Sequence, residues 1–208
     1  TSIRQLADRN GGNAADIVRV AIPKRAVRTE KGRSIPARPA VTTSTSSRIV
    51  VPLDNGVVHS ADGPTMRAWM QLADRVREAH GGVVVVMPDW RDVALMSRAL
   101  GEVAHTVWDT TATSSERYSR YLDVLAGDSR IVVGTRSAVY APVVDLELLI
   151  VVGENDPLLD EPHTPYVHAR DAAVVRNSVE GGQLVFASFT PSAELQRYVE
   201  MGFAERAE

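Results

Sequence analysis

Short apolar runs alternate with amphipathic segments along most of the chain. The uninterrupted apolar run 83–87 predicts a strand that is covered on both faces, and residues 146–152 predict a longer buried strand. Other segments repeat apolar residues at helical spacing. This alternation predicts an α/β fold, with a parallel sheet flanked by helices. The predicted strands are 49–51, 57–58, 83–87, 105–108, 131–133, 146–152 and 184–187, and the predicted helices are 1–22, 64–79, 91–100, 114–125, 168–179 and 191–201.

Turn-forming residues refine this pattern near residue 55. The sequence Asp-Asn-Gly at 54–56 predicts a turn between the strands 49–51 and 57–58. Pro64 suits the first turn of the helix that follows. We therefore expect a hairpin, a connecting loop and then a helix from residue 64 to 79.

Composition divides the chain into three parts. Residues 1–22 predict a helical appendage, because Asn13 is a good N-cap and Pro23 stops the pattern. Residues 23–47 contain three prolines and a Thr/Ser tract, so they predict a basic linker without a core. Residues 48–208 carry the alternation of strands and helices and predict one α/β domain.

The overall composition is that of a globular protein, with 44% hydrophobic and 24% charged residues. No apolar run approaches the roughly 18 residues of a membrane span, and the start of the chain does not read as a signal peptide. We expect a cytoplasmic protein that does not enter a membrane. Because cysteine is absent, thiolate zinc sites and disulfides are excluded from these residues, and we expect no metal site in them.

Charge is distributed unevenly along the chain. Residues 1–48 hold ten basic and three acidic residues, a net charge of +7, whereas the whole chain carries −3. A basic arm on an acidic body suits contact with a phosphate backbone. It also suits a linker that touches its own acidic domain, and the charge alone leaves both interpretations open.

Three stretches resemble motifs of the PriA family of replication restart proteins. They are residues 131–142 (IVVGTRSAVYAP), residues 149–156 (LIVVGEND) followed by residues 166–171 (YVHARD), and residues 187–192 (ASFTPS). The resemblance implies a RecA-like first helicase lobe at 48–208, and the end of an N-terminal DNA-binding domain at 1–22. It places the second lobe, with its zinc-binding cysteines, beyond Glu208, and it implies DNA as a partner.

The same resemblance assigns roles to individual residues. The turn after the strand 131–133 would contact DNA, where Gly134 lets the backbone approach a phosphate and a helix starting near Ser137 aims its N-terminus at the same anion. The alternative is a plain structural turn in which Arg136 forms an internal ion pair. The implied DNA-contacting residues are Gly134, Thr135, Arg136 and Ser137, and the implied residues coupling ATP to DNA are Thr190 and Pro191. Trp90, just past a strand end, is the only tryptophan that we expect at the surface.

The residues that handle ATP in this family are damaged here. A P-loop needs a lysine for the β- and γ-phosphates, and this chain has no lysine after Lys31. Gly63 and Thr65 are the only remnants in residues 59–65 (HSADGPT), where Asp62 adds negative charge. In the acidic motif, Gly153 stands in place of the magnesium-binding aspartate, and Glu154 is vestigial. We therefore doubt that ATP and magnesium are cofactors. In this respect the chain resembles a degenerate, actinobacterial-type branch of the PriA family that lacks a functional ATPase site.

The leading hypothesis is a protein that binds forked or single-stranded DNA and helps load primosome and replication proteins, without helicase activity. One alternative is an active DNA-dependent ATPase and 3′–5′ helicase with an atypical nucleotide loop. The other is a scaffold that binds only proteins.

Overall fold

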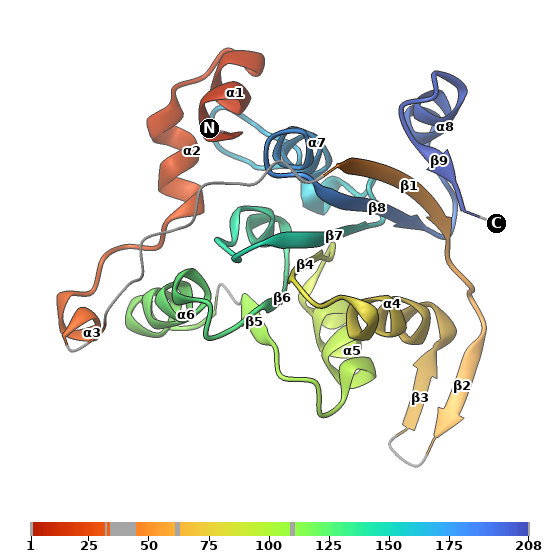
Figure 1. Ribbon diagram of the computed structural model, residues 1–208, viewed down its shortest axis with the longest axis horizontal. Helices are drawn as coiled ribbons and strands as arrows, with labels where there is room; N and C mark the ends of the chain where they lie inside the picture. The colour runs from red at the N-terminus through yellow and green to blue at the C-terminus, as the bar shows by residue number, and fades with distance from the viewer. Residues whose placement is uncertain (1, 32, 34–44, 61–62, 109–110, 208) are drawn as a thin grey trace.

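The computed structural model describes residues 2–31, 33, 45–60, 63–108 and 111–207. Its centre is a seven-stranded sheet in the order β5-β6-β4-β7-β8-β1-β9, in which every neighbouring pair is parallel (Figure 1). The predicted parallel α/β fold is therefore confirmed. The strands are β1 (Ser46–Pro52), β4 (Gly82–Val86), β5 (Thr106–Trp108), β6 (Ile131–Gly134), β7 (Leu146–Val152), β8 (Gly182–Ser188) and β9 (Glu205–Arg206).

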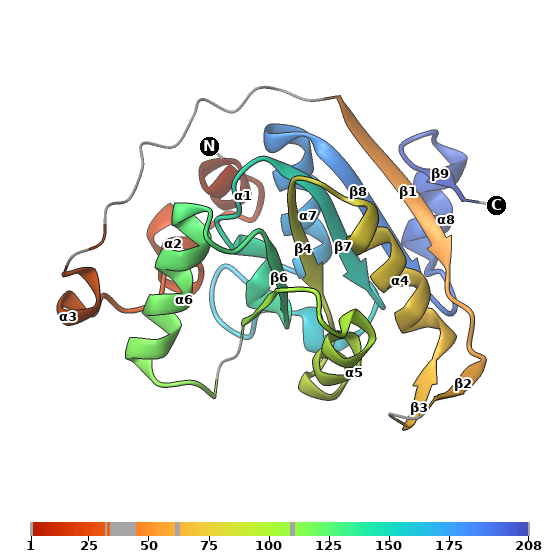
Figure 2. The same ribbon diagram turned by 60° about the horizontal axis from the view of Figure 1, so that its bottom comes forward.

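Helices cover both faces of the sheet. Along β4, Val83 and Val85 point to one face and Val84 and Val86 to the other, and all four are fully buried. The first face packs against α4 (Arg67–Glu78) and α5 (Trp90–Leu100), as Figure 2 shows. On the second face lie α1 (Ser2–Arg9), α2 (Ala14–Ala21), η1 (Arg136–Tyr140), α7 (Ala169–Glu180) and α8 (Ala193–Glu200), with α6 (Ser114–Ala126) beside them.

The first two helices belong to the core of the sheet domain. Asn13 caps α2 as predicted, because its side chain accepts a hydrogen bond from the amide of Ala15. Leu6 and Ile17 are each 1% exposed, and they join the cluster formed by the second face of the sheet and α7. The assignment of residues 1–22 to a separate domain stays a prediction. Their buried apolar side chains pack in the same hydrophobic core as those of residues 48–208.

Part of the predicted linker is folded against α6. It forms the short helix α3 (Val27–Glu30), where Glu30 accepts hydrogen bonds from Arg25, at 2.7 Å, and from the Tyr118 hydroxyl. Arg33 forms an ion pair with Asp123 of α6. The bond from Arg25, and then that from Tyr118, lowers the pKa of Glu30 to about 2. Arg33 therefore meets an acid of the sheet domain, as one interpretation of the basic segment requires, whereas Arg25 meets an acid of the linker itself.

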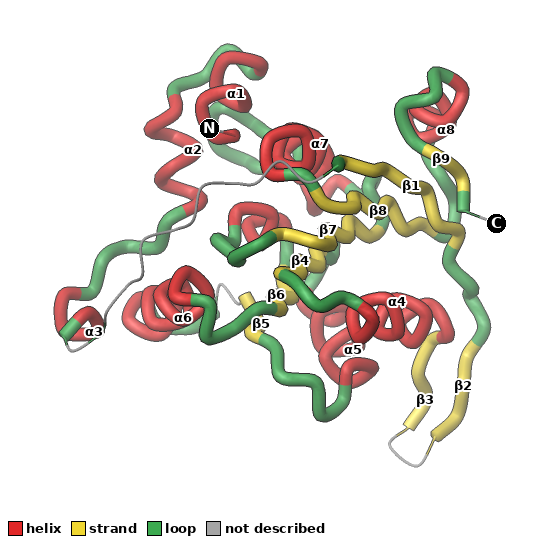
Figure 3. The backbone as a smooth tube through the Cα atoms, in the orientation of Figure 1, coloured by secondary structure: helices red, strands yellow, loops and turns green. Residues whose placement is uncertain are grey.

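The predicted hairpin around residue 55 is wrong. β2 (Val57–Ser60) pairs with β3 (Gly63–Met66) and not with β1, and this two-stranded ribbon extends away from the sheet (Figure 3). In the sheet, β1 pairs along its whole length with β8 and, at Ile49 and Val50, with β9 on its other edge. The helix also begins at Arg67 and not at Pro64, because residue 64 lies in β3 opposite His59.

Candidate functional site

All the connections that the sequence singled out lie at one edge of the sheet. Because the strands are parallel, their carboxyl ends meet there, and ligands of open α/β sheets bind at that edge. The connection β6–η1 carries the predicted DNA contacts. The connections β1–α4, β7–η2 and β8–α8 carry the remnants of the ATP motifs, where η2 is Pro157–Leu159.

Gly134 ends β6 and is buried. A Cβ atom at this position would lie 2.5 Å from the Cβ of Trp108 and 2.9 Å from the Cβ of Ala138. Glycine is therefore required by close packing between β5 and η1. The sequence predicted a different reason, a close approach of the backbone to phosphate, and the buried position does not support that reason.

The next three residues, Thr135 to Ser137, are partly exposed at the edge of the sheet. The helix expected near Ser137 is a single 3₁₀ turn, η1, which starts at Arg136. Nε of Arg136 lies 3.3 Å from Oε2 of Glu161, in an ion pair whose side chains are 37% and 11% exposed. The other carboxylate oxygen of Glu161 lies 2.7 Å from Nδ1 of His163. Arg136 is thus accessible, but an acid of its own chain is already beside it.

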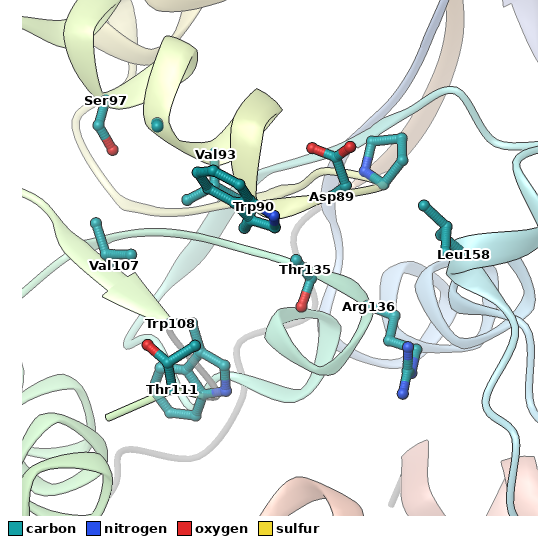
Figure 4. A pocket seen from close by; sticks show the side chains of 12 residues that line it. Asp89, Trp90, Val93, Ser97, Val107, Trp108, Thr111, Thr135, Arg136 and Leu158 are labelled. Atoms are coloured by element: carbon teal, nitrogen blue, oxygen red, sulfur yellow. The ribbon is translucent and has the colours of Figure 1, made fainter. Parts of the chain in front are cut away.

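A cavity of about 640 Å³ adjoins this turn. Its walls come from the start of α5, the end of β5 and the residues after β6 (Figure 4). Trp90 is 70% exposed in this cavity, which confirms it as a surface aromatic, while Trp69 is 2% exposed in the core. Trp108 is half-buried and lines the cavity too.

The start of α4 holds no open phosphate cradle. The amide of Arg67 donates to the Gly56 carbonyl at 2.8 Å, and the amide of Ala68 donates to the Asp54 carbonyl at 3.1 Å. The Asp54 carboxylate lies 3.5 Å from the Arg67 guanidinium. The first amides of this helix, which would face a phosphate in a P-loop, are therefore bonded to the main chain before them.

The two predicted P-loop remnants lie in the ribbon before that helix. Gly63 and Thr65 belong to β3, whose backbone pairs with β2. Asp62 lies outside the described residues. The structure thus places the two remnants in a strand, and not in a loop that curls around an anion.

The acidic motif follows β7. Gly153 has φ +58°, a left-handed backbone conformation that residues other than glycine adopt only at a cost in free energy. Glu154 is fully buried, and its Oε1 accepts a hydrogen bond from the amide of Ser192 at 3.1 Å. Within the described residues, Oε2 of Glu154 has no hydrogen-bond partner. This carboxylate is turned into the protein, where it joins the acidic motif to the start of α8.

The predicted coupling residues lie in a local turn after β8. The amide of Thr190 donates to Oγ of Ser188 at 3.3 Å, and that hydroxyl donates to the carbonyl of Thr190 at 2.8 Å. Pro191 follows and is partly exposed. Between them and the strand, Phe189 packs edge-on against Trp69 of α4, with ring centroids 6.2 Å apart. An aromatic pair therefore joins the coupling turn to the helix that would carry the triphosphate.

The residues that sequence reasoning missed are the partners of the predicted ones. Glu161 contacts Arg136 from 25 positions away, and the Ser192 amide reaches Glu154 from 38 positions away. No local pattern links residues so far apart along the chain, so neither contact could be predicted. Among the described residues, no group of three histidine or acidic side chains is arranged to hold a metal ion.

Comparison with known proteins places the chain near one family. The chain is 31% identical to the probable replication restart protein PriA of Mycobacterium tuberculosis (strain CDC 1551 / Oshkosh), over 98% of this chain. It is also 31% identical to the protein of the same name from Mycobacterium leprae, over 97% of this chain. Each match covers 35% of the relative, so the chain spans about a third of the length of these proteins.

More distant matches agree in name. A replication restart protein PriA from Synechocystis sp. is 37% identical over 89 residues, which are 42% of this chain and 11% of that protein. No protein-family model matches. A solved structure titled XPD helicase matches 78% of this chain and 35% of its own, with a TM-score of 0.47 and 12% identity, which adds nothing to the fold that the strand order establishes.

Proposed function

Because this chain is a homologue of the replication restart proteins PriA, we propose that it acts in replication restart by binding forked or single-stranded DNA, without hydrolysing ATP. Primosome and replication proteins are then its protein partners. No helix in the described part of the chain is long and apolar enough to cross a membrane.

The β6–η1 turn supports the DNA-binding half of this proposal. Thr135 and Ser137 offer hydroxyls to phosphate oxygens, and the Arg136 guanidinium adds positive charge within the same turn. All three are partly exposed at the ligand-binding edge of the sheet. These groups would contact the backbone of DNA and not its bases, so the turn alone would bind DNA of any sequence.

The hydrogen-bonded amides at the start of α4 support the other half of the proposal, the absence of ATP hydrolysis. Magnesium-bound ATP requires free amides and a lysine around its phosphates, and a carboxylate near the metal. Here the amides of Arg67 and Ala68 are bonded to carbonyls, no lysine follows Lys31, and Gly153 replaces the aspartate. The present residues therefore do not fit ATP and magnesium.

DNA binding is tested by fluorescence anisotropy with labelled single-stranded and forked oligonucleotides over a range of salt concentrations. We expect Arg136→Ala to weaken binding equally for all sequences and to lower the salt slope by about one, because one phosphate contact is lost. Arg98→Ala, which removes the same charge from an exposed position near the end of α5, serves as the control. Adding ATP and magnesium should leave the affinity unchanged.

ATP hydrolysis is tested by DNA-stimulated phosphate release. We expect no turnover above background. Turnover of more than about one per second, the low end for enzymes, that disappears in Glu154→Gln would establish the active ATPase instead.

A second candidate function is a scaffold that binds only proteins. The ion pair between Arg136 and Glu161 favours it, since an arginine that is already neutralised has less charge to offer DNA. Under this hypothesis, binding to single-stranded DNA would be undetectable even at low salt, and Arg136→Ala would change nothing.

A further inference from the structure

The proposed function assigns no role to the cavity beside the β6–η1 turn. Its apolar wall includes Val93, Val107 and Leu158, and its two aromatic rings are those of Trp90 and Trp108. Leu158 is 50% exposed and Trp90 is 70% exposed, although both are large apolar side chains. Its volume of about 640 Å³ lies within the range of ligand sites, roughly 300–1,000 Å³.

The charges around the cavity restrict what can enter it. Asp89 lines it, and Asp92 lies one turn along α5, where burial, with Asp89 and Asp156 nearby, raises the pKa of Asp92. Oδ1 of Asp89 already accepts the amides of Arg91 and Asp92, so this acid is fixed in place as the cap of α5. A phosphate inside the cavity would meet this acid. The occupant that these walls fit is therefore flat, apolar and uncharged.

The rim of the cavity is basic, in contrast to its interior. The Arg91 guanidinium lies 5.6 Å from the centroid of the Trp90 ring, and Arg136 borders the cavity on the side of β6. Figure 4 shows Thr135 and Arg136 beside the space that Trp90 and Trp108 line. A ligand that suits both parts is an uncharged ring joined to an anion that stays outside. Single-stranded nucleic acid has this chemistry, because each uncharged base is joined to a charged phosphate.

We propose that this cavity binds an unstacked base of single-stranded DNA, with Trp90 as the stacking surface and Arg136 beside the adjoining phosphate. The inference rests on the proposed DNA binding, and it adds a base contact to a turn that otherwise touches only the backbone. Because every base has an aromatic face, the contact would tolerate all four bases. It would, however, distinguish DNA with bases from an abasic strand.

The test compares a thymidine oligonucleotide with an abasic strand of the same length and charge, at one fixed salt concentration. We expect Trp90→Ala to weaken binding of the thymidine strand about five-fold or more, the loss typical of one base–aromatic stack, and to leave the abasic strand unaffected. Trp90→Phe should recover most of the affinity. Met201→Ala, which removes another side chain that is 67% exposed, should change neither strand.

A second variant fills the space without touching the tryptophan. Ala94 is exposed on α5 and lines the cavity, so Ala94→Leu should block entry and give the same selective loss as Trp90→Ala. An oligonucleotide with one 2-aminopurine should show quenched fluorescence with the wild type and less quenching with either variant.

The possible outcomes separate the two proposals. If the wild type binds neither strand, the proposed function fails. If it binds both strands equally well, and Trp90→Ala and Ala94→Leu leave the ratio unchanged, DNA binding stands and the base pocket is overturned. Equal losses on both strands would mean that Trp90 supports only the backbone contact, and they would overturn the base pocket as well.

Discussion

The β6–η1 turn and the β1–α4 connection lie on the same edge of one parallel sheet and differ in what they leave open. At β6–η1, the side chains from Thr135 to Ser137 are partly exposed beside a cavity. At β1–α4, the amides of Arg67 and Ala68 are bonded to the preceding main chain. The sheet brings both connections to a position where ligands bind, but at the second the first two amides of α4 are already paired.

The difference shows that strand order and local hydrogen bonding make separate contributions to a site. A parallel sheet fixes where ligands can bind, and this holds for both connections. Whether an anion binds depends on free donors, and at α4 the carbonyls of Asp54 and Gly56 have taken them. A fold of this class can therefore lose one of its sites while an adjacent one stays open.

The largest effect that we expect comes from Gly134→Ala. The new methyl group would overlap Trp108, and overpacking of a core costs about 3 kcal/mol at the upper end of its usual range. Urea denaturation measures the loss, and Ser137→Ala in the same turn should stay within about 0.5 kcal/mol of the wild type. A Gly134→Ala protein with unchanged stability and lost DNA binding would instead support the predicted role in approaching phosphate.

Gly153→Asp tests whether the nucleotide side can be restored. We expect the free energy of unfolding to fall by about 1 kcal/mol, because residue 153 has φ +58° and a residue with a side chain is strained there. We also expect no ATP hydrolysis, since the amides at α4 stay occupied. Gly153→Asn is the uncharged control, and its free energy of unfolding should fall by a similar amount. Phosphate release by Gly153→Asp alone would remove the contrast between the two connections.

Glu161→Gln should strengthen DNA binding at the β6–η1 turn and so increase its difference from the β1–α4 connection. Loss of the carboxylate frees Arg136, and because partly exposed ion pairs contribute at most about 1 kcal/mol, affinity for single-stranded DNA should rise roughly two- to five-fold. Anisotropy at low salt measures the change. Glu102→Gln removes the same charge from an exposed position after α5 and is the control. Equal gains in both variants would point to net charge and not to Arg136.

The smallest effect that we expect is a pH dependence at α7. Nδ1 of His168 accepts the amide of Arg170 at 3.0 Å, and burial, then the charge of Arg170, lowers the pKa of this imidazole below its usual 6.5. The unfolded chain therefore takes up a proton first as pH falls, so the free energy of unfolding should decrease below about pH 6.5. His168→Asn keeps a capping side chain and should lose this dependence. If the pH dependence persists in this variant, it does not come from His168.

Much of the fold was predictable because its strands are long buried runs. The stretch 146–152 is apolar except for Glu147, and the structure makes it β7 with the same bounds. Residues 57–66 were not predictable, because their pairing depends on which strands occupy the edges of β1, and that is decided by β8 and β9. Strand β9 has only two residues, too few to form a pattern.

For the candidate site, the sequence located the turns but not their contacts. Residues 134–137 follow β6 at the ligand-binding edge, as expected. The burial of Gly134 depends on Trp108 in the neighbouring strand, and the neutralisation of Arg136 depends on Glu161 in a later loop. Both are tertiary contacts between segments far apart along the chain, which the local patterns of the sequence do not encode.

The burial of Leu6 and Ile17 against the second face of the sheet also constrains how this protein can be dissected in the laboratory. A shortened version that begins at residue 46 would keep every strand, yet it would expose the apolar surface that α1 and α2 cover. Such a truncation is expected to precipitate or to bind detergents and dyes nonspecifically. Expression trials should therefore retain the first 22 residues.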